Sequence, residues 1–113
     1  MIGYRYHALV DRVIDGDTVD LIVDLGFHVR VYQRFRLVGV NTPELRGAES
    51  QQGIAAKAFV QSILPIGFRV IVESSKTEKY GRWLGDILLQ SSGTIQSVSQ
   101  LIRDAGHSHI ADG

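Results

Sequence analysis

The stretch Arg36-Leu-Val-Gly-Val-Asn-Thr-Pro-Glu44 decides how this chain is organised. Its apolar first half indicates a buried strand. Pro43 fixes its own φ angle and has no backbone donor, so a sheet cannot continue through it, and it biases Thr42 toward an extended conformation. The stretch therefore predicts a strand that ends at a rigid corner, where it presents the side chains of Asn41 and Glu44 and the carbonyl of Thr42.

A second polar turn lies earlier in the chain, at Asp15-Gly-Asp-Thr18, between two apolar runs. If this turn meets the corner, Asp15 and Asp17 join the corner residues in an oxygen-rich metal site. By itself the turn is ordinary, because Asp, Gly and Thr all favour turns. From these residues alone, the segment could be either a metal-binding loop or an ordinary turn.

The bulk composition narrows the class of protein. The 113 residues are enough for one domain with a single modest core. Twelve basic and twelve acidic residues cancel, so a polyanion would have to be held by a local cluster of charges. The absence of cysteine excludes disulfides, thiolate metal sites and thiol catalysis. With no long apolar segment at the N-terminus, we expect a cytoplasmic protein that does not associate with membranes. We also expect it to be a monomer.

The periodicity of apolar residues predicts the elements of the fold. Strands are expected over 4–14, 19–24, 29–34 with a continuation into 35–40, 68–73 and 83–90, and helices over 49–64 and 96–105. The inward face of the first helix is expected to carry Ile54, Ala55, Ala58, Phe59, Ser62 and Ile63. Five short strands with one helix after the third are typical of a small barrel of the oligonucleotide-binding type, an α+β fold that is mainly β.

Three blocks, taken together and in order, resemble the staphylococcal nuclease (thermonuclease) family: Asp15-Gly-Asp-Thr-Val19, the Arg36 to Glu44 stretch, and Lys79-Tyr-Gly-Arg82. The likeness extends through Leu101-Ile-Arg-Asp-Ala-Gly106, so it covers nearly all of a single nuclease domain over residues 1–113. It implies a five-stranded barrel with two flanking helices, without the C-terminal helix of longer relatives. It also implies calcium-dependent cleavage of DNA or RNA, with single-stranded or frayed substrates preferred.

The resemblance implies a set of calcium ligands. Asp17, residue 41 and the carbonyl of Thr42 would bind the ion directly, and Asp15 would act through water. The family has Asp where this chain has Asn41, so one formal negative charge is missing. Calcium accepts an amide oxygen, but its affinity is tuned by ligand charge. We therefore expect calcium to bind here more weakly than with Asp at this position.

The resemblance also implies catalytic and substrate-binding roles. Glu44 would be the general base or would position the attacking water. Arg36 and Arg82 would contact the scissile phosphate, since a guanidinium grips phosphate oxygens through paired, permanently charged donors. Lys79 and Tyr80 would hold a neighbouring phosphate. Taken singly, Lys79 and Arg82 are more often solvated loop charges, and Arg36 in an apolar strand is equally compatible with a structural ion pair.

Two other functions compete with a nuclease. One is a nucleic-acid-binding barrel that has lost efficient catalysis through Asn41, and the other is a protein-interaction module. Tyr4, Tyr6 and Tyr32 offer faces on which bases can stack, although strand tyrosines usually pack with the hydroxyl at the surface. Retention of the base and of both arginines argues against the interaction module, and the net charge of zero argues against tight non-specific binding.

Overall fold

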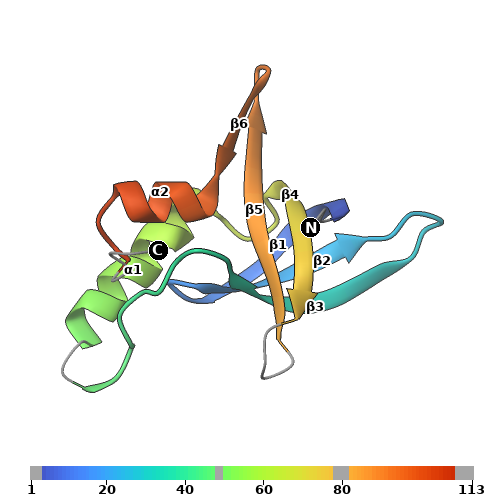
Figure 1. Ribbon diagram of the computed structural model, residues 1–113. Helices are drawn as coiled ribbons and strands as arrows, with labels where there is room; N and C mark the ends of the chain where they lie inside the picture. Colours follow the sequence, from blue (N-terminus) through green and yellow to red (C-terminus); the bar gives the residue numbers. More distant parts are fainter. Residues whose placement is uncertain (1–3, 48–49, 78–81, 109–113) are drawn as a thin grey trace.

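The fold consists of a strongly bent sheet with two helices at one end, as the computed structural model shows for residues 4–47, 50–77 and 82–108 (Figure 1). In chain order the elements are β1 Tyr4–Asp15, β2 Thr18–Asp24, β3 Arg30–Leu37, α1 Ser50–Ile63, β4 Arg69–Thr77, β5 Trp83–Ser91, β6 Thr94–Ser97 and α2 Val98–Asp104. Within this part of the chain, no helix is long and apolar enough to cross a membrane.

Five of the strands close into a barrel. β1 pairs antiparallel with both β2 and β4, β2 pairs with β3, and β4 pairs with β5. A short parallel pairing between β3 and β5 completes the ring, with Phe35 opposite Trp83, Arg36 opposite Leu84 and Leu37 opposite Gly85. The predicted mainly β fold, with a closed five-stranded barrel and two helices, is confirmed.

The barrel interior follows from the two-residue period of the strands. Burial alternates over Ala8 to Val10 in β1 and over Val19 to Val23 in β2, where every second side chain is buried. Two register shifts in β1, one between Val10 and Arg12 and one between Val13 and Asp15, bend the strand around the core. The strands contribute these buried core residues: Ala8, Val10, Val13, Val19, Leu21, Val23, Phe35, Leu37, Val70, Val72 and Ile87.

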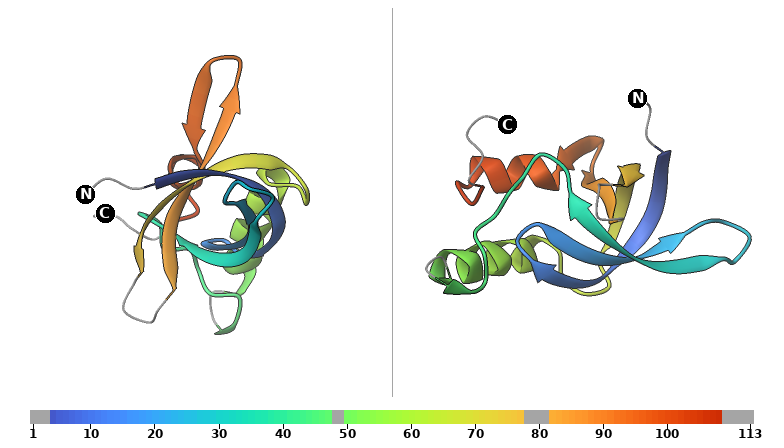
Figure 2. Two further views of the ribbon diagram at one scale, coloured as in Figure 1. Left: turned by 90° about the vertical axis from the view of Figure 1, so that its right-hand side faces the viewer. Right: turned by 60° about the horizontal axis from the view of Figure 1, so that its bottom comes forward.

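Helix α1 covers one end of the barrel (Figure 2). Its buried face is formed by Gly53, Ala56 and Val60. The predicted inward face was therefore partly wrong: Phe59 and Ile63 pack against the core, but Ile54, for example, is 59% exposed. Gly53 lies on the buried face, and only glycine fits there, because a Cβ at that position would collide with the backbone carbonyls of the segment before α1.

The second helix is capped at both ends. The Ser97 hydroxyl accepts a hydrogen bond from the backbone N–H of Gln100 at the start of α2. At the other end Gly106 has a φ angle of 82°, and the N–H groups of Gly106 and His107 donate to the carbonyls of Arg103 and Ile102. This pattern is a Schellman motif, which the glycine permits.

Several predicted boundaries were wrong. β3 ends at Leu37 rather than at the proline corner, because Gly39 adopts a φ angle of 72° and turns the chain out of the sheet. β4 continues to Thr77, four residues beyond its predicted end. The start of the predicted second helix belongs to β6, which forms a hairpin with β5 that projects from the barrel (Figure 1).

Candidate active site

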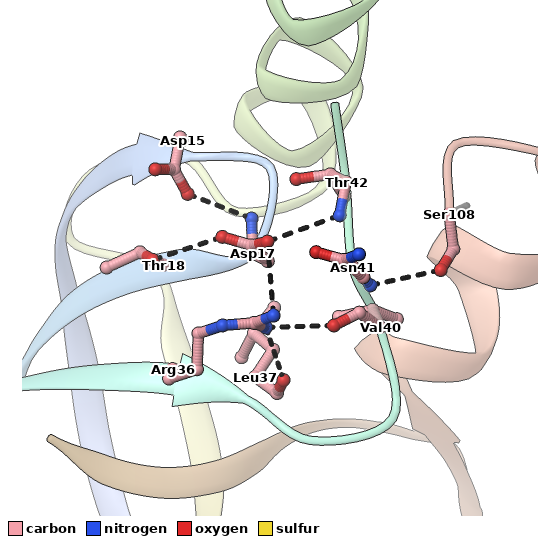
Figure 3. A network of polar contacts seen from close by, with 9 residues as sticks. All are labelled: Asp15, Asp17, Thr18, Arg36, Leu37, Val40, Asn41, Thr42 and Ser108. Carbon is pink, nitrogen blue, oxygen red and sulfur yellow. Dashed lines mark hydrogen bonds and ion pairs between the residues drawn. The ribbon is translucent and has the colours of Figure 1, made fainter. Parts of the chain in front are cut away.

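The β1–β2 turn holds two carboxylates close together. The backbone N–H of Asp17 donates to Oδ1 of Asp15 at 3.1 Å, and the Thr18 hydroxyl donates to Oδ1 of Asp17 at 3.2 Å (Figure 3). Between the two acids, Gly16 leaves no room for a side chain, since an added Cβ would lie 2.7 Å from Oγ1 of Thr42. The turn therefore packs directly against the segment that follows β3.

That segment is also hydrogen-bonded to the turn. The backbone N–H of Thr42 donates to Oδ2 of Asp17 at 3.2 Å, and the N–H of Leu37 donates to the carbonyl of Asp17 at 2.8 Å. Thr42 is buried, with 4% of its surface exposed. The structure thus brings Asp15, Asp17 and Thr42 into one cluster, as the sequence predicted, and it does so across 25 residues of chain.

Arg36 is fixed beside this cluster. Its Nη1 donates to the carbonyls of Leu37 and Val40, each at 2.9 Å, and its Nη2 lies 3.5 Å from Oδ2 of Asp17. The Arg36 side chain is only 20% exposed. Arg36 therefore does form an ion pair, and its partner is Asp17. The guanidinium is therefore held in one orientation, with its charge next to the carboxylates.

The second arginine faces the same space. Arg82 precedes β5 directly, and the parallel register of β3 with β5 sets Arg36 opposite Leu84. Arg36, Arg82 and Leu84 line one shallow hollow of about 340 Å³ together with the backbone of the turn after β3. Arg82 is exposed. Two guanidinium groups from distant parts of the chain thus border a single open surface.

Glu44 lies two residues beyond Thr42 and is exposed to solvent. Among the described residues, no hydrogen bond or ion pair is made by its carboxylate. Its main chain is held instead, because the close approach of Gly53 in α1 packs that helix against the carbonyls of Pro43 and Glu44. The backbone is fixed and the carboxylate is available, which is the arrangement that a group exchanging protons with solvent requires.

Asn41 is also exposed, and its neighbours are held from the C-terminal side of the fold. The Asn41 N–H donates to the Ser108 hydroxyl at 3.1 Å (Figure 3), and Nη1 of Arg103 donates to the Gly39 carbonyl at 2.8 Å. The sequence reasoning assigned no role to Arg103 or Ser108. Arg103 belongs to the Leu101 to Gly106 block, but nothing in that pattern indicates that its side chain reaches back to Gly39.

The two carboxylates of the turn titrate differently. Burial, the hydrogen bond to Asp17 and the negative charge of Asp17 together raise the pKa of Asp15 to about 6. Burial alone would also raise the pKa of Asp17, but the hydrogen bond with Asp15, the charge of Arg36 and the N–H of Thr42 outweigh it and lower that pKa. At neutral pH the site holds two negative charges that repel each other.

Replacing Asp15 by Asn is expected to stabilise the metal-free protein at pH 8. Because the folded-state pKa of Asp15 is raised from 3.8 to about 6, its contribution to stability is present below about pH 4 and is lost as the pH rises to about 6. The gain should be on the order of 1 kcal/mol after allowance for solvent screening. Thermal unfolding in chelator at pH 4 and pH 8 measures it. Equal stability of Asp15→Asn and the unmodified protein at pH 8 would contradict this effect.

The donor set suits a hard cation. Two carboxylates, the amide oxygen of Asn41 and the carbonyl of Thr42 are all oxygen ligands, which calcium and magnesium prefer. Burial is the main cause of the raised pKa of Asp15, and the charge of Asp17 adds to it; a bound cation would relieve the repulsion between these two carboxylates. Among the described residues, no three His, Cys, Asp or Glu side chains gather at one point. A metal here would therefore depend on Asn41 and on the backbone of Thr42.

Lys79 and Tyr80, for which the sequence predicts contacts with a neighbouring phosphate, lie outside the described residues. Their roles stay predictions. Arg82 ends the same sequence block, is described, and lines the hollow beside Arg36 at the start of β5.

The class of protein is a barrel of the oligonucleotide-binding type, with two acids in the β1–β2 turn and two arginines at the β3–β5 seam. Within it the particular family is clear. The family model described as staphylococcal nuclease homologue matches residues 34–109, and the chain belongs to that family. The family predicted from the three sequence blocks is confirmed.

Three individual relatives share between 26% and 36% identity with this chain. Protein ParB of Escherichia coli is 36% identical over 81 residues, which make up 69% of this chain and 39% of ParB. Endonuclease YhcR of Bacillus subtilis is 30% identical over 101 residues, covering 80% of this chain and 8% of that protein. An uncharacterized protein of Methanocaldococcus jannaschii is 26% identical, and the match covers 94% of this chain and 59% of the relative. The chain thus spans less than two thirds of each of these proteins.

Proposed function

We propose that this chain is a calcium-dependent nuclease that hydrolyses phosphodiester bonds of DNA or RNA. The observation that carries the proposal is the convergence of Arg36 and Arg82 on one open hollow beside the Asp17 carboxylate. Membership in the staphylococcal nuclease homologue family supports the same function, as does the similarity to endonuclease YhcR.

Different residues serve different steps of hydrolysis. A water molecule attacks phosphorus, the bond to the leaving oxygen breaks, and negative charge accumulates on the equatorial oxygens. Arg36 and Arg82 are suited to bind those oxygens, since each presents fixed donors that match phosphate geometry. Arg36 is already held in place by the Leu37 and Val40 carbonyls, so little reorganisation is needed when substrate binds.

Glu44 is suited to accept the proton of the attacking water. Its carboxylate is exposed and makes no hydrogen bond or ion pair with the described residues, and its backbone is fixed by the contact with α1. Calcium, held by Asp17, Asn41 and the Thr42 carbonyl with Asp15 nearby, would supply positive charge that polarises the phosphate and orients water. The chain itself provides the base and the two phosphate-binding cations.

The direct test is cleavage of a fluorescent single-stranded DNA and of an RNA of the same sequence by the purified protein. Cleavage is expected in calcium and should stop when a chelator is added. Binding without cleavage, at every calcium concentration, would instead favour a nucleic-acid-binding barrel in which Asn41 has weakened the metal site. If the protein shows neither binding nor cleavage, both the nuclease and the nucleic-acid-binding functions are overturned.

Replacing Asn41 by Asp is expected to tighten calcium binding about tenfold or more, because it adds a charged oxygen ligand to the set. Asn41 is exposed and its observed hydrogen bond comes from the backbone, so the substitution should leave the fold intact. Calorimetric titration with calcium measures the change. Asn41→Ala is the matched control and should weaken binding, and equal affinities in all three proteins would place residue 41 outside the metal shell.

A further inference from the structure

The outward face of β3 carries a row of cationic and aromatic side chains. Along Arg30–Leu37 the side chains alternate between faces, and Phe35 and Leu37 are buried inside the barrel. Arg30, Tyr32, Arg34 and Arg36 therefore lie on the outer face; we call them the β3 outer row. Neighbours in this row are about 6.6 Å apart along the strand, so Tyr32 lies about 13 Å from Arg36.

A hollow lies beside this row. Tyr32 is in register with Ile22 of β2, Ile22 with Leu9 of β1, and Leu9 with Arg69 of β4, so one line of residues crosses four strands on the outer face. Around it is a hollow of about 350 Å³ lined by His7, Ala8, Leu9, Ile22, Asp24, Arg30, Arg69 and Val70. Its floor is apolar, and it has an arginine on each side.

The charges that face the hollow favour an anion. Arg30 and Arg69 make no hydrogen bond or ion pair within the described part of the chain, and the hollow holds one carboxylate, Asp24, which accepts the Gly26 N–H at 2.8 Å. Arg34 differs, because it grips both oxygens of Asp20 at 2.7 and 3.1 Å. The guanidinium groups free to meet a ligand are thus those of Arg30 and Arg69.

The ring of Tyr32 is available as well. Tyr32 is 73% exposed and lies opposite Ile22, whose side chain lines the hollow. β2 and β3 form a hairpin that extends away from the two helices (Figures 1 and 2). A flat exposed ring beside an apolar floor and two cations is the chemistry that a nucleotide requires, since the base stacks and the phosphate pairs with guanidinium.

We propose that single-stranded nucleic acid runs from the Arg36 site along the β3 outer row and places one nucleotide in this hollow, with its base against Tyr32 and its phosphate between Arg30 and Arg69. The direction rests on the proposed function, because Arg36 marks where the scissile phosphate lies. The strand must be single, because a base paired within a duplex cannot offer its face to Tyr32. The hollow therefore adds a second nucleotide subsite and gives the protein its preference for unpaired substrate.

The binding test uses a fluorescently labelled single strand of about a dozen nucleotides, followed by anisotropy in chelator so that no cleavage occurs. Tyr32→Ala and Arg69→Gln are each expected to weaken binding about fivefold or more, the loss that corresponds to one stacked base or one phosphate contact. Tyr32→Leu, which keeps an apolar side chain on β3, should be weakened as Tyr32→Ala is. A duplex of the same sequence should bind more weakly than the single strand.

Two controls match these variants. Ile95→Ala removes an exposed apolar side chain from β6, on the hairpin with β5, and Lys57→Ala removes one positive charge from α1. Both should bind as the unmodified protein does. If Tyr32→Ala and Ile95→Ala bind alike, or if the duplex binds as tightly as the single strand, the proposal is overturned.

Cleavage separates this proposal from the proposed nuclease function. With a dinucleotide substrate, which is too short to reach Tyr32, Tyr32→Ala should show unchanged kcat/KM. With the longer strand, the same variant should show a KM raised about fivefold with kcat unchanged. If the unmodified protein cleaves nothing, the nuclease function fails, while the anisotropy measurements still decide whether the hollow binds a nucleotide. An equal loss on both substrates would place Tyr32 in the cleavage site and contradict the subsite.

Discussion

Glu44→Gln is expected to lower phosphodiester cleavage by a factor of about 10² to 10⁴ while the protein stays folded. The substitution keeps the size of the side chain and removes its ability to accept a proton. Stability should hardly change, because Glu44 is exposed and its carboxylate makes no hydrogen bond or ion pair with the described residues. Single-turnover cleavage of a fluorescent single strand in calcium measures the loss.

The control for Glu44→Gln is Glu73→Gln. Glu73 is an acid on β4 whose carboxylate pairs with Arg5 at 2.9 Å, so its replacement also removes one negative charge from the surface. It should leave cleavage within about twofold of the unmodified rate, since it lies far from the turn between β1 and β2 in the sheet register. Cleavage by Glu44→Gln at the rate of this control would remove Glu44 from the mechanism.

Arg36 and Arg82 should give equal losses of activity and unequal losses of stability. Either Arg→Ala change is expected to lower kcat by about 10² to 10³, as the removal of one fixed donor to a developing negative charge does. Arg82→Ala should change the free energy of unfolding by no more than about 0.5 kcal/mol, because Arg82 is exposed. Arg36→Ala should cost about 2 kcal/mol or more, because it removes the side-chain donor from the Leu37 and Val40 carbonyls and the positive charge beside the Asp17 carboxylate.

Chemical denaturation and cleavage assays on the same preparations make this comparison, and Arg82→Lys extends it. Lysine keeps the charge but not the paired donors, so Arg82→Lys should recover only part of the activity. A fully active Arg82→Ala would mean that the hollow shared with Arg36 does not receive the phosphate. An Arg36→Ala protein that is as stable as the unmodified one would contradict the buried network around Asp17.

The parts of the fold that sequence could predict are those governed by local periodicity. Alternation along β1 and β2 places Val10, Val19 and Leu21 in the core, where the structure has them. Which face of α1 is buried was harder to predict from sequence. That face is set by the close packing of Gly53 on the backbone of Pro43 and Glu44, not by the apolar pattern around Ile54. Local pattern carries no information about which neighbour a helix will meet.

Some contacts of the candidate site could be predicted from sequence and others could not. The pairing of the β1–β2 turn with the corner after β3 followed from two sequence blocks, and the structure joins them through Asp17 and Thr42. The contacts of Arg103 with Gly39 and of Ser108 with Asn41 span more than 60 residues and involve no recognisable motif. Such contacts depend on the docking of α2, which only the assembled barrel determines.

The short seam between β3 and β5 has a practical consequence. Three residue pairs close the barrel there, whereas seven join β2 to β3, and the two arginines that border the hollow come from the two sides of this seam. A slight opening would part the arginines while the antiparallel pairs kept their hydrogen bonds. Mild denaturant should then abolish turnover before circular dichroism registers any loss of strand, which would make catalysis the most sensitive gauge of whether the ring is closed.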